Sequence, residues 1–324
     1  MQMSAESPLL IILGPTASGK THLATRVAYE IGGEILSADS RQVYRQMDIG
    51  TGKDLDEYVV NGTPVPHHLI NIRDAGDKYN VNDFQHDFVD SYQQTLANGH
   101  VPVVCGGTGF YIYALLKGHA NDTVPVNESL RAMLETLSNE ELLTKFHNAD
   151  SRYHALADTS TRKRLVRALE IVAYLNEHPE TGVDFGTESV TYPALLFGLN
   201  PPVETRRERI SKRLVARLKQ GLIEEVQSLL NQDIAPDSLI YYGLEYKYVT
   251  LYLTGAMTFE EMHTKLETEI HRFAKRQMTF FRKMEKDGLI INWIPDEWPE
   301  SEKIQFIIAR YREFKSGKAG NMSV

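Results

Sequence analysis

Short apolar runs alternate along the chain with longer segments in which apolar residues recur every three or four positions. Uninterrupted runs of five or six apolar residues are typical of parallel strands that are buried on both faces. The predicted strands are Leu9–Leu13, 34–38, Val101–Cys105 and Ala194–Leu199. Helical spacing follows the first strand, at Leu23, Ala24, Val27 and Ala28, and returns over residues 80–96. This alternation predicts an α/β fold, with a parallel sheet flanked by helices.

The pattern changes after residue 117. Residues 118–190 contain two helical stretches, 128–148 and 161–176, between polar loops, and no strand is expected before residue 194. We therefore expect an α/β core formed by residues 1–117 and 191–315, and a small helical insertion domain at 118–190. Residues 43–77 are loop-like, and the adjacent His67 and His68 fit a solvated or substrate-facing loop better than a metal site.

Two later helices carry many basic residues. In the first helix, Arg206, Arg209, Arg213 and Arg217 fall within about 80° of one another at about 100° per residue. This row is either a solvated charged face or a surface for phosphate-backbone contact. The last long helix begins with the capping-box pattern Thr258 to Glu261, and basic residues are concentrated in its second half.

Composition limits the possible classes of protein. The chain has 324 residues, 42% of them hydrophobic, with a formal net charge of −8, so any surface that binds nucleic acid must be local. Cys105 is the single cysteine, which excludes an intrachain disulfide and favours a reducing cytoplasm. The N-terminal residues lack a basic export signal and no apolar run reaches membrane-spanning length, so we expect no membrane association.

A phosphate-binding motif follows the first predicted strand. The residues are Gly14, Pro15, Thr16, Ala17, Ser18, Gly19, Lys20 and Thr21, which match G-x-x-x-x-G-K-[ST] at every fixed position. The glycines let backbone N–H groups turn toward a polyphosphate, Lys20 adds a positive charge, and Thr21 can coordinate Mg²⁺. ATP binding is the default expectation, but the motif does not specify what is attached to the phosphates.

The ends of the predicted strands carry few acidic residues. Asp39 follows the second strand and is expected beside the phosphate loop, as either a functional carboxylate or a turn cap. The third strand ends in Gly106, Gly107 and Thr108, and the fourth in Asn200. Kinases and ATPases of this architecture place a metal-binding carboxylate at such a position, so its absence argues against phosphoryl transfer.

Several motifs in one order resemble the tRNA dimethylallyltransferases, also called tRNA isopentenyltransferases, of the IPP transferase family. They are GPTASGKT, DSRQVYRQMDIGTGK (39–53), PHHLI (66–70), VNDFQ (81–85), GGTGFY (106–111), KRLVRALE (163–170) and FAKRQMTFFR (273–282). The resemblance implies a P-loop NTPase-like core with a helical insertion. It also implies transfer of a dimethylallyl group from dimethylallyl diphosphate to N6 of adenosine 37 in tRNAs that read codons beginning with U, releasing diphosphate.

The same resemblance implies roles for particular residues. The loop from Gly14 to Thr21 would bind the diphosphate, with Mg²⁺ at Thr21, and Asp39 would be the general base; Lys20, Thr21 and Thr108 complete the implied catalytic set. The implied contacts with the tRNA anticodon stem-loop are Asp39, Ser40, Arg41, Gln42, Thr108, Arg131, Lys163, Arg164, Leu165, Val166, Arg167, Lys275, Arg276 and Gln277. We expect a cytoplasmic monomer.

The chain departs from the family pattern in two places. Gly52 and Asp54 stand where alanine and proline are usual. The segment 241–247 is only loosely similar to that of the family and lacks its arginine after glycine-tyrosine. Three alternatives stay open from the sequence: a cytokinin-type enzyme that prenylates free adenine nucleotides, a P-loop small-molecule kinase, and a non-catalytic RNA-binding P-loop protein.

Overall fold

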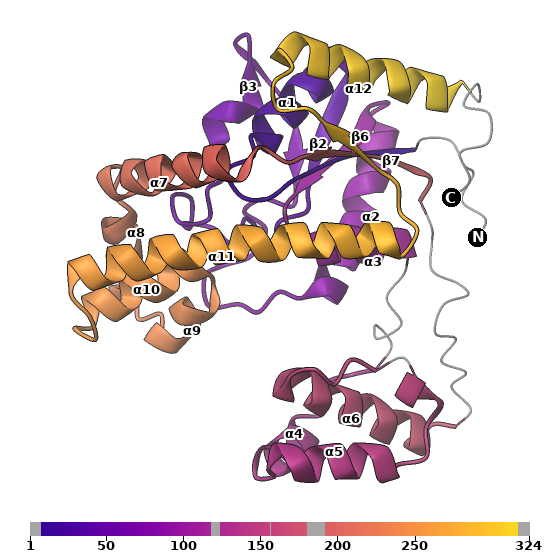
Figure 1. Cartoon of the computed structure of the whole chain (residues 1–324), viewed down its shortest axis with the longest axis vertical. Coiled ribbons are helices and arrows are strands. Elements are labelled where there is room, and N and C mark those ends of the chain that lie inside the picture. Colours follow the sequence, from indigo (N-terminus) through magenta and orange to yellow (C-terminus); the bar gives the residue numbers. More distant parts are fainter. Residues whose placement is uncertain (1–7, 118–123, 156, 180–191, 317–324) are drawn as a thin grey trace. The chain divides into compact units, whose positions relative to one another are not determined.

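The computed structural model describes residues 8–117, 124–155, 157–179 and 192–316, and these form two compact units (Figure 1). One unit contains Met1–Leu116 together with Tyr192–Val324, and the other contains Lys117–Thr191. Within the described residues, no helix is both long enough and apolar enough to span a bilayer.

The larger unit is built on a parallel sheet in the order β5-β2-β6-β1-β7-β8. These strands are His67–His68, Gly33–Ser37, Val101–Gly106, Leu9–Leu13, Ala194–Leu199 and Ile291–Ile294, respectively. A separate antiparallel pair joins β3 (Val59–Val60) to β4 (Thr63–Pro64). Because all six strands of the main sheet are parallel, their carboxyl ends meet at one edge.

The sheet confirms the predicted α/β class and the four predicted strands. It also contains two strands that were not predicted, β5 and β8, one at each end of the sheet. The prediction that His67 and His68 lie in a loop was wrong, because both residues pair with β2. Edge strands of two and four residues carry too little apolar periodicity to be recognised from sequence.

Alternate residues of β1 enter two different cores, since successive side chains of a strand point to opposite faces. Leu9, Ile11 and Leu13 pack with α2 (Val81–Ala97), α3 (Gly109–Lys117) and α11 (Phe259–Lys286). Leu10 and Ile12 pack with α1 (Lys20–Ile31) and α12 (Glu300–Lys315) on the other face. The remaining helices of this unit are α7 (Val203–Lys219), α8 (Leu222–Leu230), α9 (Pro236–Tyr241) and α10 (Leu244–Leu253).

The smaller unit is a helical cluster of α4 (Glu128–Glu135), α5 (Asn139–Asn148) and α6 (Arg162–Glu177), with a 3-10 turn at Arg152–Ala155. The predicted helix over 128–148 is two helices. Ser138 interrupts it because its side chain accepts from the Glu141 N–H while the Glu141 carboxylate accepts from the Ser138 N–H. This capping box starts a new helix.

The loop after β2 is attached to the helices that follow β7. The Glu225 carboxylate of α8 accepts the backbone N–H groups of Asp48, Ile49 and Gly50 at 2.8 to 2.9 Å. The Lys53 side chain is fully buried and donates to Tyr44 O, Asp48 and Asn71. These bonds hold residues 48–54 in one conformation although the segment has little regular structure.

Gly52 lies directly against the Arg217 guanidinium. Its φ of 65° is left-handed, and a Cβ built on it would lie 1.8 Å from Arg217 Nη2. Arg217 is buried, with Asp54 and Glu245 each 3.7 Å from its guanidinium, and its Nη2 has no hydrogen-bond partner among the described residues. A side chain at position 52 would therefore displace Arg217.

A buried carboxylate stabilises the edge between β2 and β5. Glu34 is 2% exposed and accepts hydrogen bonds from Thr95 and Asn98, with His68 and His100 at 2.6 and 2.5 Å. Burial raises the pKa of Glu34. The hydrogen bonds from His100, His68, Asn98 and Thr95 together have a larger effect and lower the pKa to about 2. The ionised form is thus the one that the fold stabilises.

We predict that Glu34→Gln lowers the free energy of unfolding at pH 7 by about 3 kcal/mol, because a pKa lowered from 4.5 to about 2 has that stabilising value. The contribution is complete above the unfolded-state pKa and is lost as pH falls from about 5 toward 2. Urea unfolding at several pH values measures it. Glu30→Gln, at an exposed position of α1, is the control. A deficit that stays constant down to pH 2 would contradict the assignment.

We predict that Gly52→Ala costs about 1–3 kcal/mol more stability than Gly99→Ala, because overpacking adds to the backbone strain. Gly99 has a similar φ of 74°, but nothing lies within 4 Å of the position that an added Cβ would take. The comparison of the two variants by urea unfolding therefore isolates the Arg217 contact. Equal costs would show that Arg217 moves away freely.

Candidate active site at the carboxyl edge of the sheet

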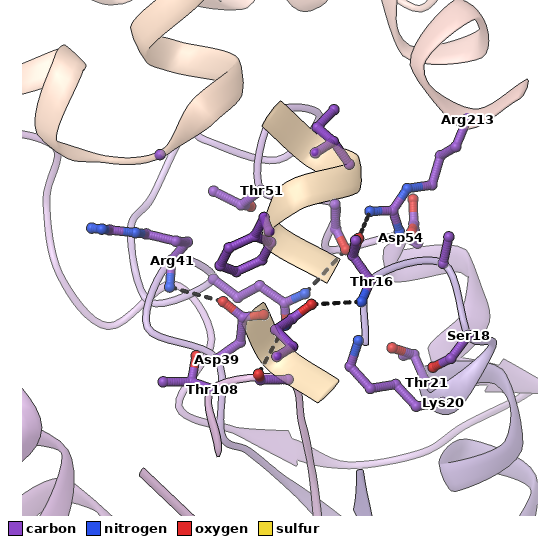
Figure 2. A pocket seen from close by; sticks show the side chains of 18 of the residues that line it. Thr16, Ser18, Lys20, Thr21, Asp39, Arg41, Thr51, Asp54, Thr108 and Arg213 are labelled. Atoms are coloured by element: carbon purple, nitrogen blue, oxygen red, sulfur yellow. Dashed lines mark hydrogen bonds between the residues drawn. The ribbon is translucent and has the colours of Figure 1, made fainter. Parts of the chain in front are cut away.

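A cavity of about 950 Å³ opens at the carboxyl edge of β1, β2 and β6. Its wall contains the phosphate loop, the residues from Asp39 to Gln42 and the turn from Gly107 to Phe110. Residues of α7, α10 and α11 close it from the other side. Figure 2 shows Thr16, Ser18, Lys20 and Thr21 gathered together, with Asp39, Arg41 and Thr108 across from them.

The phosphate loop has the conformation that its glycines predict. Gly19 has φ 82° and starts α1, so the helix N-terminus faces the cavity. Ala17 also has a positive φ, 61°, which is costly for a residue with a side chain. Ser18 is buried, and its hydroxyl has no hydrogen-bond partner within the described chain.

Two cationic side chains reach the same part of the cavity. Burial lowers the pKa of Lys20, and burial together with Arg217 lowers the pKa of Arg213 to about 10. Arg213 still carries its charge at neutral pH, and its guanidinium donates to the Thr16 hydroxyl. Positive charge at the N-terminus of α1 is suited to a polyphosphate.

The arginine row of α7 is not a uniformly solvated face, because two of its four members are buried. Arg206 is buried and bonds Asn200, while Arg217 is buried between Asp54 and Glu245. Arg209, Arg213 and Arg217 all line the cavity. Arg213 and Arg217 face inward because the apolar stripe beside them packs on the core, whereas Arg209 stays exposed. Sequence periodicity does not distinguish a cavity wall from solvent.

The residues after β2 form an ordered strip along the cavity. Asp39 Oδ1 accepts the Arg41 N–H at 2.9 Å, and Thr108 Oγ1 accepts the Ser40 N–H at 3.1 Å. The Arg41 guanidinium lies over the Tyr241 ring, 5.1 Å from its centroid. Asp39 thus makes the turn contact expected of a cap, and it also lines the cavity.

Gln42 differs from its neighbours because it is buried. Its Nε2 donates to Gly52 O at 3.0 Å and its Oε1 accepts from the Ser37 hydroxyl at 3.2 Å. Both ends of the amide thus hold the loop onto β2. Gln42 therefore supports residue 52, and it also lines the cavity.

One further strand-end carboxylate was missed. Asp296 follows β8, lines the cavity and pairs with Arg209 at 3.3 Å. The expectation that Asp39 alone occupies such a position was wrong, because β8 was not recognised. Glu57 also lines the cavity; burial raises its pKa, whereas His22 and Lys20 act in the opposite direction.

The expected RNA contacts of the smaller unit divide into two groups. Arg131 and Arg167 bond the buried Glu170 at 2.8 and 3.0 Å, and Leu165 is a core residue that is 2% exposed. Leu165 is therefore corrected from an RNA contact to a packing residue. Val166 also packs against this core. Lys163 and Arg164 are exposed, with Arg164 paired to Asp158.

The three expected contacts on α11 also differ among themselves. Lys275 and Arg276 are exposed. Gln277 instead lies between two segments of the cavity wall: its Oε1 accepts the Thr16 N–H and its Nε2 donates to Gly107 O, both at 2.8 Å.

The donor set of the cavity fits Mg²⁺ that is held mainly by phosphates and water. Among the described residues, no three His, Cys, Asp or Glu side chains come together as a metal site. Thr21 and the unpartnered Ser18 hydroxyl supply oxygen atoms at the helix N-terminus. Mg²⁺ characteristically keeps several waters and takes one or two protein ligands beside phosphate oxygens.

Comparison with known proteins agrees with this architecture. The family model "IPP transferase" matches residues 42–284, and the model "Isopentenyl transferase" matches residues 7–64. The chain is 51% identical over 306 residues to tRNA dimethylallyltransferase 1 of Porphyromonas gingivalis, covering 94% of this chain and 99% of that protein. Identity to tRNA dimethylallyltransferase 2 of Bacteroides fragilis is 49%, covering 94% and 98%.

Solved structures share the fold. The full-length tRNA isopentenylpyrophosphate transferase of Bacillus halodurans superposes with a TM-score of 0.70 at 31% identity, covering 98% of this chain and all of that one. A eukaryotic dimethylallyltransferase crystallised acting on tRNA superposes with a TM-score of 0.80 at 21% identity, covering 96% and 80%. Since one family model spans most of the sequence and relatives near 50% identity extend over nearly all of it, the chain belongs to the IPP transferase family.

Proposed function

We propose that this protein transfers a dimethylallyl group from dimethylallyl diphosphate to N6 of adenosine 37 in tRNAs that read codons beginning with U, with release of diphosphate. The observation that carries the proposal is the placement of the phosphate loop and Asp39 on facing walls of one cavity. The names of its relatives support tRNA as the acceptor. We propose further that it acts as a cytoplasmic monomer.

The donor end of the cavity is suited to diphosphate as a leaving group. Breaking the allylic C–O bond leaves negative charge on the diphosphate and positive charge on carbon. Lys20, Arg213 and the loop N–H groups stabilise the negative charge that develops on the diphosphate. Thr21 would hold Mg²⁺ there, and the ion would supply positive charge to the diphosphate.

The acceptor end supplies the base. The adenine amine is a weak nucleophile, since its lone pair is delocalised into the ring. As the new C–N bond forms, the N6–H becomes acidic and its proton passes to the Asp39 carboxylate. Asp39 is oriented by the Arg41 N–H, and Thr108 orients Ser40 beside it. Diphosphate leaves with the electron pair of the broken C–O bond.

The acceptor base must leave its stack to reach Asp39, as for other enzymes that modify bases inside RNA. We propose that the exposed cations Lys163, Arg164, Lys275 and Arg276 contact the anticodon stem-loop, with residues 118–190 acting as an RNA-contacting domain. This acceptor distinguishes the protein from the cytokinin-type enzymes. A kinase is disfavoured because Asp296, the second strand-end carboxylate, is paired with Arg209.

We predict that Asp39→Asn lowers transfer at least about 100-fold, because general base catalysis is worth about that much, while affinity for the stem-loop changes little. The assay follows radiolabelled dimethylallyl diphosphate into an anticodon stem-loop with A36-A37-A38 or into AMP. Asp90→Asn, at an exposed position of α2, is the control. Label in AMP alone would establish the cytokinin-type activity, and turnover of Asp39→Asn within a few-fold of wild type would refute the base assignment.

We predict that replacing Lys275 and Arg276 together with alanine weakens stem-loop binding and lowers the slope of log affinity against log salt by about 1.4–1.8, since two phosphate contacts are lost. Fluorescence anisotropy at several salt concentrations measures this slope. Lys219→Ala, an exposed cation near the end of α7, controls for net charge. An unchanged slope in the double variant would place the RNA elsewhere.

A further inference from the structure

The Gln277 side chain forms hydrogen bonds with two separate segments of the cavity wall, which a residue that only contacts RNA would not need. It lies in the second half of the 28-residue helix α11, with exposed cations immediately before it. Its amide oxygen accepts the Thr16 N–H and its amide nitrogen donates to Gly107 O, each at 2.8 Å. Thr16 belongs to the phosphate loop and Gly107 to the turn after β6, so one side chain connects two strand ends.

The turn after β6 is shaped to receive this side chain. A Cβ on Gly107 would lie 2.6 Å from Gln277 Nε2, 3.3 Å from Gly14 O and 3.4 Å from Lys20 Nζ. Gly107 therefore allows the amide, the phosphate loop and the phosphate-binding lysine to approach one another. The neighbouring Gly109 packs in the same way, with its Cβ position 2.6 Å from the Phe280 ring.

The phosphate loop needs external support at this place. Ala17, directly after Thr16, has φ 61°, a conformation that costs about 1–2 kcal/mol for a residue with a Cβ. Thr16 is held on both sides, because Gln277 binds its N–H while Arg213 donates to its hydroxyl. Such a backbone persists only where its surroundings hold it.

Turning the Gln277 amide away from the phosphate loop to contact RNA would break its hydrogen bond to Thr16. The Thr16 N–H would then lose its partner at a partly buried site, which is unfavourable. Lys275 and Arg276 make no such contact with the loop and are exposed. The geometry therefore separates Gln277 from the cations that precede it.

We propose that Gln277 is a positioning residue that keeps the phosphate loop in its diphosphate-binding shape, and that it is not an RNA contact. This inference rests on the proposed function for the identity of the diphosphate donor. According to this proposal, the hydrogen bonds of the Gln277 amide raise the affinity of the phosphate loop for the diphosphate group.

The test measures inorganic pyrophosphate binding by calorimetry with Mg²⁺ present, and stem-loop binding by anisotropy, on the full chain. Gln277→Met keeps the length of the side chain without its amide, and we expect about a tenfold weaker pyrophosphate affinity with RNA affinity within about twofold of wild type. Transfer kinetics should show a higher KM for dimethylallyl diphosphate and an unchanged KM for the stem-loop. Gln227→Met, at an exposed glutamine of α8, should match wild type in all three.

A second variant disrupts the same contact by a substitution at Gly107, the partner of the Gln277 amide nitrogen. Gly107→Ala leaves Gln277 in the chain but occupies the space of its Nε2, so we expect a similar loss of pyrophosphate affinity. In the double variant the losses should not add, giving about tenfold rather than about 100-fold, because both remove one contact. Circular dichroism and thermal unfolding verify that each variant is folded.

Three outcomes would overturn the proposal: unchanged pyrophosphate affinity in Gln277→Met, a loss confined to RNA affinity, or additive losses in the double variant. These outcomes can be distinguished from the case in which the proposed function itself is wrong. In that case wild-type protein would transfer no prenyl group to the stem-loop, whereas the pyrophosphate measurement stands independently of turnover.

Discussion

Parallel pairing of β1 with β6, and of β6 with β2, is the constraint on which the site depends. In this register the phosphate loop, the Gly107 turn and Asp39 all emerge from the same edge of the sheet. Each strand ends where an apolar run gives way to glycine or a polar residue. β1 pairs with β6 on one side and with β7 on the other, and these ladders fix the position of the three segments.

The helices after β7 complete the site from outside the sheet. Arg213 of α7 and Gln277 of α11 both reach Thr16, and Arg217 of α7 rests on Gly52. The residues after β2, at Asp39, and the phosphate loop, at Lys20, are therefore held by the same packed helices. A site that breaks one bond while forming another requires such rigid placement of both substrates.

The two departures from the family pattern come into contact in this fold. Gly52 and Asp54 lie in the loop after β2, and Glu245 lies in the segment without the expected arginine. All three meet Arg217, which is buried against the glycine and 3.7 Å from each carboxylate. A buried guanidinium needs neighbouring negative charge. The substitutions are thus parts of one charge cluster rather than separate changes.

Local sequence was sufficient for the α/β class, four strands of the sheet, the phosphate loop and the position of Asp39, because each depends on a contiguous pattern. It did not determine β5, β8 or Asp296, since short edge strands carry little periodicity. It also could not distinguish the exposed Lys275 and Arg276 from Gln277 within a shared motif. Those differences depend on which side of a helix meets the core, the cavity or solvent. Only the packing of distant segments decides that, and it placed three arginines of the α7 row in the wall of the cavity.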